Sequence, residues 1–226
     1  MELSERILLF KQALGFEGLD DDQHAEIAGL AFEKQFSKGD IVFDLGDPCE
    51  LFHVVAKGLV KVSVDSSTGF RITYLMAGQG EPLNLVGPFT GNPRMLSAEA
   101  MEDSIILCVE RNAFTSFAFA SPPLINNIIS ILGQAVDSAN SRMIDMLEKR
   151  VDQRLLRVLH TLYQKFGHTL HFTSTELAEL AGTTTESTLR AMGHLRKMGI
   201  VESGRAEVRI MRPEALQDPG SETFWL

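Results

Sequence analysis

The chain has 226 residues, of which 44% are hydrophobic and 23% are charged, and its formal net charge is −9. A chain of this length can bury the cores of one large or two small domains, and we expect two. No run approaches the roughly 18 apolar residues of a membrane span, and the N-terminus MELSERILLF lacks the cleavage pattern of a secretory signal. The sequence therefore predicts a cytoplasmic protein without a membrane partner.

The N-terminal half of the chain changes its pattern near residue 36. Residues 1 to about 34 show helical patterns, separated by the acidic segment GFEGLDDD. Short segments rich in β-branched and aromatic residues follow, with glycines between them: DIVFDLGD, LFHVVAKGLVKVSV, RITYLMAG and SIILCVE. Residues 64–71, VDSSTGFR, are expected to form a hairpin tip. Short, evenly spaced strands with glycine turns indicate an all-β roll or barrel.

A long helix is predicted after Pro122 and Pro123, since proline is tolerated in the first turn of a helix. Its apolar residues alternate spacings of four and three through three heptads, and the pattern runs on to Arg150. Such a seam is typical of a two-stranded coiled coil, so we predict a homodimer. The alternative is that this face packs against the β-roll of its own chain. The seam consists of Ile125, Ile129, Leu132, Val136, Ala139, Met143 and Met146.

The stretch from Thr173 to Gly199 predicts two short helices joined by a tight turn, a helix-turn-helix. Two T-x-x-E capping boxes begin these helices, at Thr173 and at Thr183, and Gly182 suits the left-handed end of the first. A preceding helix, VDQRLLRVLHTLYQKFG, is expected to pack beneath them. The following GIVESGRAEVRIM predicts strands at 200–202 and 207–211, a wing. The expected apolar stripes are Leu177, Leu180 and Ala181 on the first helix and Leu189, Met192, Leu195 and Met198 on the second.

Charge is distributed unevenly along the chain. Residues 149–212 carry eleven Lys/Arg against six Asp/Glu, whereas residues 1–148 carry ten against twenty-one. An acidic front and a basic back fit a sensor joined to a module that binds a polyanion, because local charge governs phosphate contact. The alternative is that charged residues are unevenly distributed by chance, without a functional reason.

The order of β-roll, heptad helix and winged helix resembles the Crp/Fnr superfamily of bacterial transcription factors. The specific matches are GDPCELFHVVAKGLVKV in the roll and TSTELAELAGTTTESTLRAMGHLRKMGIV, in which the family's E-[ST]-[TV]-x-R pattern stands at Glu186 to Arg190. The resemblance implies an α+β fold with a cyclic-nucleotide-binding-like jelly roll at residues 1–121, a dimerisation helix at 122–150 and a winged helix-turn-helix at 151–226. It also implies a dimeric regulator that binds a palindromic site on double-stranded DNA, and RNA polymerase if it activates.

The first turn of a recognition helix enters the major groove, so its side chains can contact base edges. Glu186 can accept from cytosine, and Arg190, one turn later, can bind guanine with two hydrogen bonds; the alternative is a surface ion pair. Thr185 and Leu189 neighbour them, and Thr185 departs from the arginine of the cAMP receptor branch. Residues expected to contact phosphate are Thr173, Ser174, Thr175, His194, Lys197 and Arg205.

The resemblance also points to an effector site in the roll, where this chain departs from its relatives. Asn84 and Leu85 stand in place of Gly-Glu, Arg94 falls at the phosphate-binding arginine, and Met95 replaces a hydroxyl residue. These departures argue against cAMP and leave the small effector unknown. Cys49 and Cys108 are the only cysteines, which excludes a four-cysteine iron–sulfur cluster. Haem remains a family option, with His53, His24, Cys49, Cys108, Met76, Met95 or Met101 as candidate ligands.

Catalysis is not expected, because metal-dependent β-roll enzymes of the cupin type need an H-x-H pair that this chain lacks. The nearest approach, His168 and His171 in HTLH, is expected to be solvated loop. An alternative to the DNA-binding regulator is a dimeric ligand-binding protein whose helical C-terminus binds another protein. The two differ in salt dependence, since only DNA binding predicts a steep loss of affinity with salt.

Overall fold

The computed structural model describes residues 1–66, 71–148 and 150–216, which form two compact units. The first unit comprises Met1–Val64 and Leu75–Gly133, and the second comprises Asp65–Tyr74 and Gln134–Leu226. The units divide inside the long helix α5 (Pro122–Glu148). The division at residues 121 and 150 follows the elements of the chain and stays a prediction.

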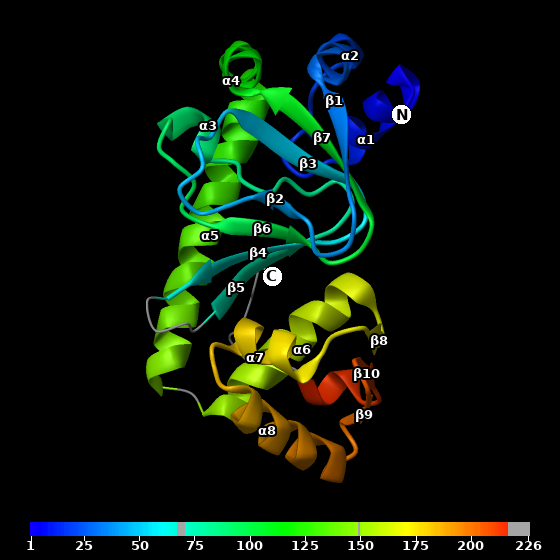
Figure 1. Cartoon of the computed structure of the whole chain (residues 1–226), viewed down its shortest axis with the longest axis vertical. Helices are drawn as coiled ribbons and strands as arrows, with labels where there is room; N and C mark the ends of the chain where they lie inside the picture. The colour runs from blue at the N-terminus through cyan, green and yellow to red at the C-terminus, as the bar shows by residue number, and fades with distance from the viewer. Residues whose placement is uncertain (67–70, 149, 217–226) are drawn as a thin grey trace. The chain divides into compact units, whose positions relative to one another are not determined.

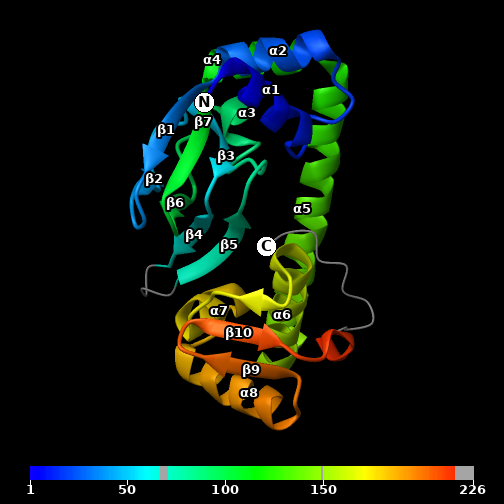
Figure 2. The ribbon, with the colours of Figure 1, turned by 90° about the vertical axis from the view of Figure 1, so that its right-hand side faces the viewer.

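Besides part of α5, the described residues of the first unit form four helices. They are α1 (Leu3–Gln12), α2 (Asp21–Leu30), the single turn α3 (Gly87–Thr90) and α4 (Arg111–Ala120). The Asp20 side chain accepts a hydrogen bond from Gln23 N and thereby caps α2. Helices α1 and α2 pack on each other, as Figure 2 shows, and α2 also contacts α4.

Two antiparallel sheets form the body of the first unit. One has the order β1-β7-β3, and the other has the order β2-β6-β4-β5; Figure 1 shows them as two layers. Apolar residues such as Phe52, Val54, Ile106 and Leu107 are fully buried in this roll. The predicted all-β roll is therefore confirmed. The strand bounds are β1 (Phe32–Phe36), β2 (Ile41–Phe43), β3 (Leu51–Lys57), β4 (Val60–Asp65), β5 (Arg71–Ala77), β6 (Ser97–Ala100) and β7 (Ser104–Glu110).

Four elements of the first unit differ from our expectation, one of which is the single turn α3, for which no helix was predicted. The predicted helical region at residues 1–34 was wrong at its end, because the backbone is extended at Ala31 and Phe32 begins β1, pairing with Cys108. Strand β6 and helix α4 were not predicted. Strand β6 has the sequence SAEA, which lacks the β-branched and aromatic residues on which a strand prediction depends.

The second unit contains α6 (Val151–Phe166), α7 (Ser174–Ala181), α8 (Thr185–Lys197), β8 (Thr169–Leu170), β9 (Val201–Gly204), β10 (Glu207–Ile210) and the 3-10 turn η1 (Pro213–Leu216). The predicted packing residues of α6 are buried at Leu155, Val158, Leu159 and Leu162, and Val151 is half-buried. Helix α6 contacts both α7 and α8. The helix-turn-helix thus rests on α6, as the apolar pattern predicted.

The wing has one strand more than we predicted. The sheet order is β8-β10-β9, with Val208 opposite Leu170 on one side and Ser203 on the other (Figure 2). The interpretation of HTLH as solvated loop was therefore wrong in part. His168 Nδ1 lies 3.2 Å from the Ile210 carbonyl, although His171 is exposed.

One prediction, the tip of the 64–71 hairpin, lies partly outside the described residues, and the tail residues Phe224 and Trp225 lie outside them as well. Within the described ranges, no single helix is long and apolar enough to cross a membrane. The pair Arg111–Ala120 and Pro122–Leu147, bent by 105°, passes that test of length and composition only when its two helices are taken together.

Candidate nucleic-acid interface

Local hydrogen bonds define the helix-turn-helix. Thr173 Oγ1 accepts from Glu176 N at 3.2 Å, and the Glu176 carboxylate accepts from Thr173 N at 2.5 Å, which is the predicted capping box. Gly182 ends α7 with φ of +59°, a conformation that glycine adopts without strain. The cap of α8 is Thr184, whose Oγ1 accepts from Ser187 N at 3.2 Å. The capping box predicted at Thr183 was therefore wrong by one residue.

Helix α8 has one buried and one exposed face. Thr188, Ala191, Met192 and Leu195 are buried against the rest of the unit. Leu189 and Met198 are 54% and 51% exposed, so the predicted apolar stripe was wrong at both ends. A spacing of strictly three falls about 60° short of a full turn at each step, so four such residues drift halfway around an α-helix. Exposure of Leu189 suits the base-contacting position that we expected for it.

The exposed face of α8 carries the predicted base-contacting pair. Arg190 Nη2 lies 2.9 Å from Glu186 Oε1, and the two side chains are 77% and 83% exposed. Such an exposed pair one turn apart contributes only a few tenths of a kcal/mol to stability. Exchange of this pairing for contacts with base edges therefore costs little. Thr185 is half-buried, and its Oγ1 lies 3.5 Å from Thr175 Oγ1 of α7.

The expected phosphate contacts lie around this face. Thr173 and Thr175 are exposed at the start of α7, and Ser174 beside them is half-buried. His194 and Lys197 are exposed in the last two turns of α8. Arg205 is exposed in the turn between β9 and β10. The second unit thus exposes hydroxyl or cationic groups at the start of α7, on α8 and in the turn between β9 and β10.

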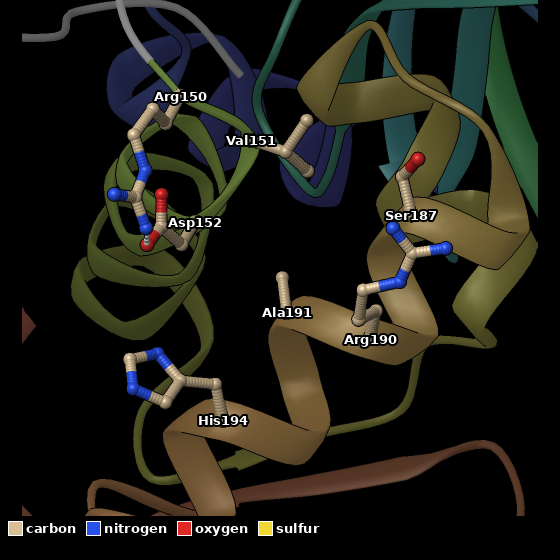
Figure 3. Close-up of a pocket in the computed structure, with 7 residues that line it drawn as sticks. All are labelled: Arg150, Val151, Asp152, Ser187, Arg190, Ala191 and His194. Atoms are coloured by element: carbon tan, nitrogen blue, oxygen red, sulfur yellow. Dashed lines mark hydrogen bonds and ion pairs between the residues drawn. The ribbon is translucent and has the colours of Figure 1, made fainter.

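A groove beside α8 adds Arg150, which we did not predict for this interface. It has a volume of about 370 Å³, and Figure 3 shows that α6 and the residue before it line one side while α8 lines the other. Arg150 caps the N-terminus of α6, and its Nη2 lies 2.8 Å from Asp152 Oδ2. The heptad pattern had assigned Arg150 to the preceding helix, which ends at Glu148. The lining residues are Arg150, Val151, Asp152, Ser187, Arg190, Ala191 and His194.

The predicted effector arginine lies inside the roll. Arg94 is only 3% exposed; its Nη2 donates to the Leu51 carbonyl at 2.6 Å and lies 3.3 Å from His53 Nδ1. Its guanidinium carbon lies 4.0 Å from the centroid of the Phe43 ring. Arg94 Nε and Nη1 are buried and have no hydrogen-bond partner in the described chain. Because buried donors are normally paired, these two atoms can accommodate an anion.

Burial also controls the protonation of this cluster. Burial, followed by the charge of Arg94, lowers the pKa of His53 to about 3. Burial likewise lowers the pKa of Arg94 and raises the pKa of Cys108 to about 11. Near neutral pH, His53 is therefore a neutral partner and Cys108 is a thiol.

The other predicted effector residues differ in their environments. Asn84 Oδ1 accepts from Val86 N and Gly87 N at 3.0 and 2.9 Å, Leu85 is buried, and Met95 is 73% exposed. Within the described residues, no group of three or more His, Cys, Asp and Glu side chains could hold a metal ion. His53 lies beside both Arg94 and Phe43, and the centroids of the His53 and Phe43 rings are 5.4 Å apart.

Helix α5 exposes the predicted dimer seam. Ile129, Val136 and Met143 are 62%, 59% and 61% exposed, and Met146 is 40% exposed, whereas Ile125, Leu132 and Ala139 are half-buried. A different stripe of the helix is buried against the same chain. It consists of Leu124, Ile128, Ile131, Ser138 and Asp145. The seam is thus separate from the stripe that packs within one chain.

Comparison with known proteins finds one matching family model in each half of the chain. Residues 33–121 match the family model of the cyclic nucleotide-binding domain, and residues 153–218 match that of the Crp-like helix-turn-helix domain. The cyclic AMP receptor protein of Thermus thermophilus is 26% identical over 209 residues, which cover 90% of this chain and 94% of that protein. The CRP-like cAMP-activated global transcriptional regulator of Mycobacterium tuberculosis is 22% identical over 209 residues, which cover 89% and 93%.

Solved structures show the same fold. FixK2 from Bradyrhizobium japonicum superposes with a TM-score of 0.73 at 20% identity and covers 82% of this chain and 95% of its own. The c-di-GMP responsive global regulator CLP from Xanthomonas campestris gives 0.75 at 17% identity, with 85% and 100% covered.

Proposed function

Because the chain belongs to the Crp/Fnr family of transcriptional regulators, we propose that it is a homodimer that binds a palindromic operator under the control of an anionic effector. It is a DNA-binding regulator rather than an enzyme, with a helix-turn-helix domain and a cyclic nucleotide-binding domain. The observation that carries the proposal is the exposed face of α8, where Glu186 and Arg190 project beside the cationic groups of the same unit.

Each group has a defined role in the proposed complex. Glu186 and Arg190 contact the bases of a G·C-containing half-site, with Thr185 and Leu189 beside them. Thr173, Ser174, Thr175, His194, Lys197 and Arg205 contact phosphates, and Arg150 extends this set along the groove. Two half-sites about 34 Å apart require two copies of α8, which the seam of α5 supplies by pairing two chains.

Operator selection from a random duplex library tests the DNA-binding part of the proposal. We expect enrichment of an inverted repeat, and an affinity for it that falls steeply as salt concentration rises. Binding without sequence preference would overturn the palindromic operator. Absence of binding at low salt would favour the alternative, a dimeric ligand-binding protein with a helical interaction module.

The effector is proposed from the unpaired donors of Arg94. Nε and Nη1 lie inside the roll without a partner in the described chain, and an oxygen of a phosphate or carboxylate would satisfy at least one of these donors. Two of the similar proteins are named for cAMP and one is named for c-di-GMP. In this chain Asn84 Oδ1 is already bonded to two backbone amides and Met95 faces outward, which supports an anion other than cAMP. Haem stays a candidate of the same class, because its propionates are carboxylates and its iron needs only a single axial ligand such as His53.

Mass analysis and an absorption spectrum of the purified protein would identify a co-purified effector. A panel of cAMP, c-di-GMP, haem and small carboxylates can then be titrated while thermal unfolding is followed. We expect an anion that raises the midpoint of the wild type but not of Arg94→Gln. An effector that stabilises both proteins equally would show that Arg94 is not the anion-binding group.

A further inference from the structure

Two arginines and a methionine from α5 and α6 contact the end of α7. Arg142 Nη2 donates to the Leu180 carbonyl at 3.0 Å. Arg154 Nε donates to the Ala181 carbonyl at 3.1 Å, and its Nη2 donates to the Gly182 carbonyl at 3.4 Å. A Cβ placed on Gly182 would lie 2.6 Å from Met146 Cε, so the methionine reaches the backbone of the turn.

These contacts act on the main chain of the helix-turn-helix. The last carbonyls of an α-helix have no partner within the helix, and cations near them are favourable because the C-terminus carries partial negative charge. Leu180, Ala181 and Gly182 immediately precede the turn into α8. Bonds to three consecutive carbonyls therefore restrain the direction in which the chain enters α8.

Helices α5 and α6, which carry these two arginines, are bound to each other by an ion pair and a hydrogen bond. Arg157 of α6 lies 2.5 Å from Asp145 of α5 and also donates to Ser141 at 2.9 Å. Both members of the ion pair are buried, with side chains 8% and 7% exposed. A buried, hydrogen-bonded pair holds a defined geometry, because loss of either partner leaves a buried charge. The end of α5, the start of α6 and the turn at Gly182 thus form one connected corner.

We propose that Arg142 and Arg154 are positioning residues for DNA recognition, which hold α8 in a single orientation relative to the C-terminal part of α5 before DNA is bound. This inference rests on the proposed function, because it concerns how the base-contacting helix is presented. The two arginines touch neither the bases nor the phosphates. They act through the backbone at Leu180 to Gly182, and without them α8 samples a range of orientations.

The orientation can be measured without DNA. Cys49 and Cys108 are buried, so spin labels at Ile144→Cys on α5 and Met198→Cys at the end of α8 attach to exposed sites. Double electron–electron resonance, with labelled chains diluted in unlabelled protein, then gives the distance between α5 and α8 within one chain. We expect one narrow distribution for the otherwise wild-type protein. Arg142→Met with Arg154→Met should broaden it about twofold or more, as expected for a locally unfastened element.

DNA binding supplies a readout that a loss of stability would not produce. We expect the double variant to lose about tenfold in affinity for its best operator and much less for operators with half-sites one base pair closer or farther apart. Preference for the spacing therefore shrinks while the salt slope is unchanged. Arg154→Lys, which keeps a charge but loses the fork of donors, should give an intermediate result.

Lys165→Met is the matched control, because it removes one positive charge from α6 about three turns from Arg154. It should leave both the distance distribution and the spacing preference as in the wild type. If the double variant does not fold, Arg154→Lys carries the test by itself. An unchanged distance distribution in folded variants would overturn the inference even if DNA binding is confirmed. A wild type that binds no operator would instead contradict the proposed function and leave the spectroscopic result valid.

Discussion

At the scale of single residues, α8 separates side chains that should specify sequence from those that should only attract DNA. Glu186 and Arg190 pair with each other in the absence of DNA, on the exposed face of the N-terminal half of the helix. Lys197 is exposed at its end and lies in the last turn, where no base edge would be within reach. Truncation of Glu186 or Arg190 should therefore change sequence preference, whereas truncation of Lys197 should change only the overall affinity for DNA.

Arg190→Ala should remove discrimination at one base pair of each half-site. Loss of a bidentate contact with guanine costs about 1–3 kcal/mol against the best site and little against altered sites. Lys197→Ala should weaken binding to all sequences alike and reduce the salt slope by about one. Fluorescence anisotropy on a set of single-substitution operators measures both effects. Unchanged selectivity in Arg190→Ala would refute its assignment as a base-contacting residue.

His53 should make the protein sensitive to acid. In the folded chain its pKa is about 3, whereas in the unfolded chain it protonates below about 6.5. Between these values the unfolded state binds more protons, so the free energy of unfolding falls as pH drops from 6.5 towards 3. The loss amounts to at most about 2 kcal/mol at pH 5. Urea unfolding followed by circular dichroism at pH 7 and pH 5 should show a smaller loss for His53→Gln than for the wild type. Equal losses in the two proteins would contradict the buried neutral histidine.

At the scale of elements, α5 carries three kinds of contact on different sides. One stripe is buried within its own chain, Arg142 and Met146 reach the turn after α7, and the apolar seam remains exposed. An apolar stripe from Ile125 to Met146, in which four of seven side chains are exposed in one chain, supports pairing with a second copy. Met146 belongs to the seam and also lies against Gly182 in the turn before α8. The proposed dimer contact is therefore next to the helix-turn-helix.

Met143→Glu should separate the dimer. Met143 is 61% exposed in one chain, so a carboxylate there costs little in a monomer, but in the seam it would be buried opposite its copy. We expect dimer affinity to fall about a hundredfold, corresponding to about 3 kcal/mol. Ile144→Glu is the matched control, because Ile144 is also exposed and apolar but lies off the seam. Sedimentation velocity over a concentration series measures both, and equal dissociation of the two variants would contradict the seam.

At the scale of the whole molecule, the sequence predicted those features that depend on local pattern. The strands β3 and β7, the helix α5 and the helix-turn-helix each carry strong periodicity, capping boxes or glycine signals. Strands β6 and β8 could not be predicted in this way, because SAEA and Thr169–Leu170 become strands only through the partners that tertiary structure gives them. The same holds for Phe32, which extends a helical pattern in sequence but pairs with Cys108 in space.

The candidate sites also differ in how far local sequence pattern predicts them. Glu186, Arg190 and the residues around them share one helix and its neighbours, so their spacing was enough to place them together. Arg94, His53 and Phe43 come from three separate segments, and no local spacing reveals that they meet. Arg150 was assigned to the wrong helix, because the heptad pattern runs on to it, whereas α5 ends at Glu148 and Arg150 is the N-cap residue of α6. The sequence therefore did not place residues whose position depends on contacts between distant segments, or residues at a helix boundary that the apolar pattern runs across.

The hydrogen bonds that hold the turn before α8 end on carbonyl oxygens, which every amino acid possesses. Substitutions at Thr185, Glu186, Leu189 or Arg190 leave these acceptors in place. The exposed face of α8 can therefore change its base preference, in evolution or by design, without new compensating changes in the scaffold. Gly182 is the exception, because its left-handed backbone and the nearby Met146 exclude a larger side chain.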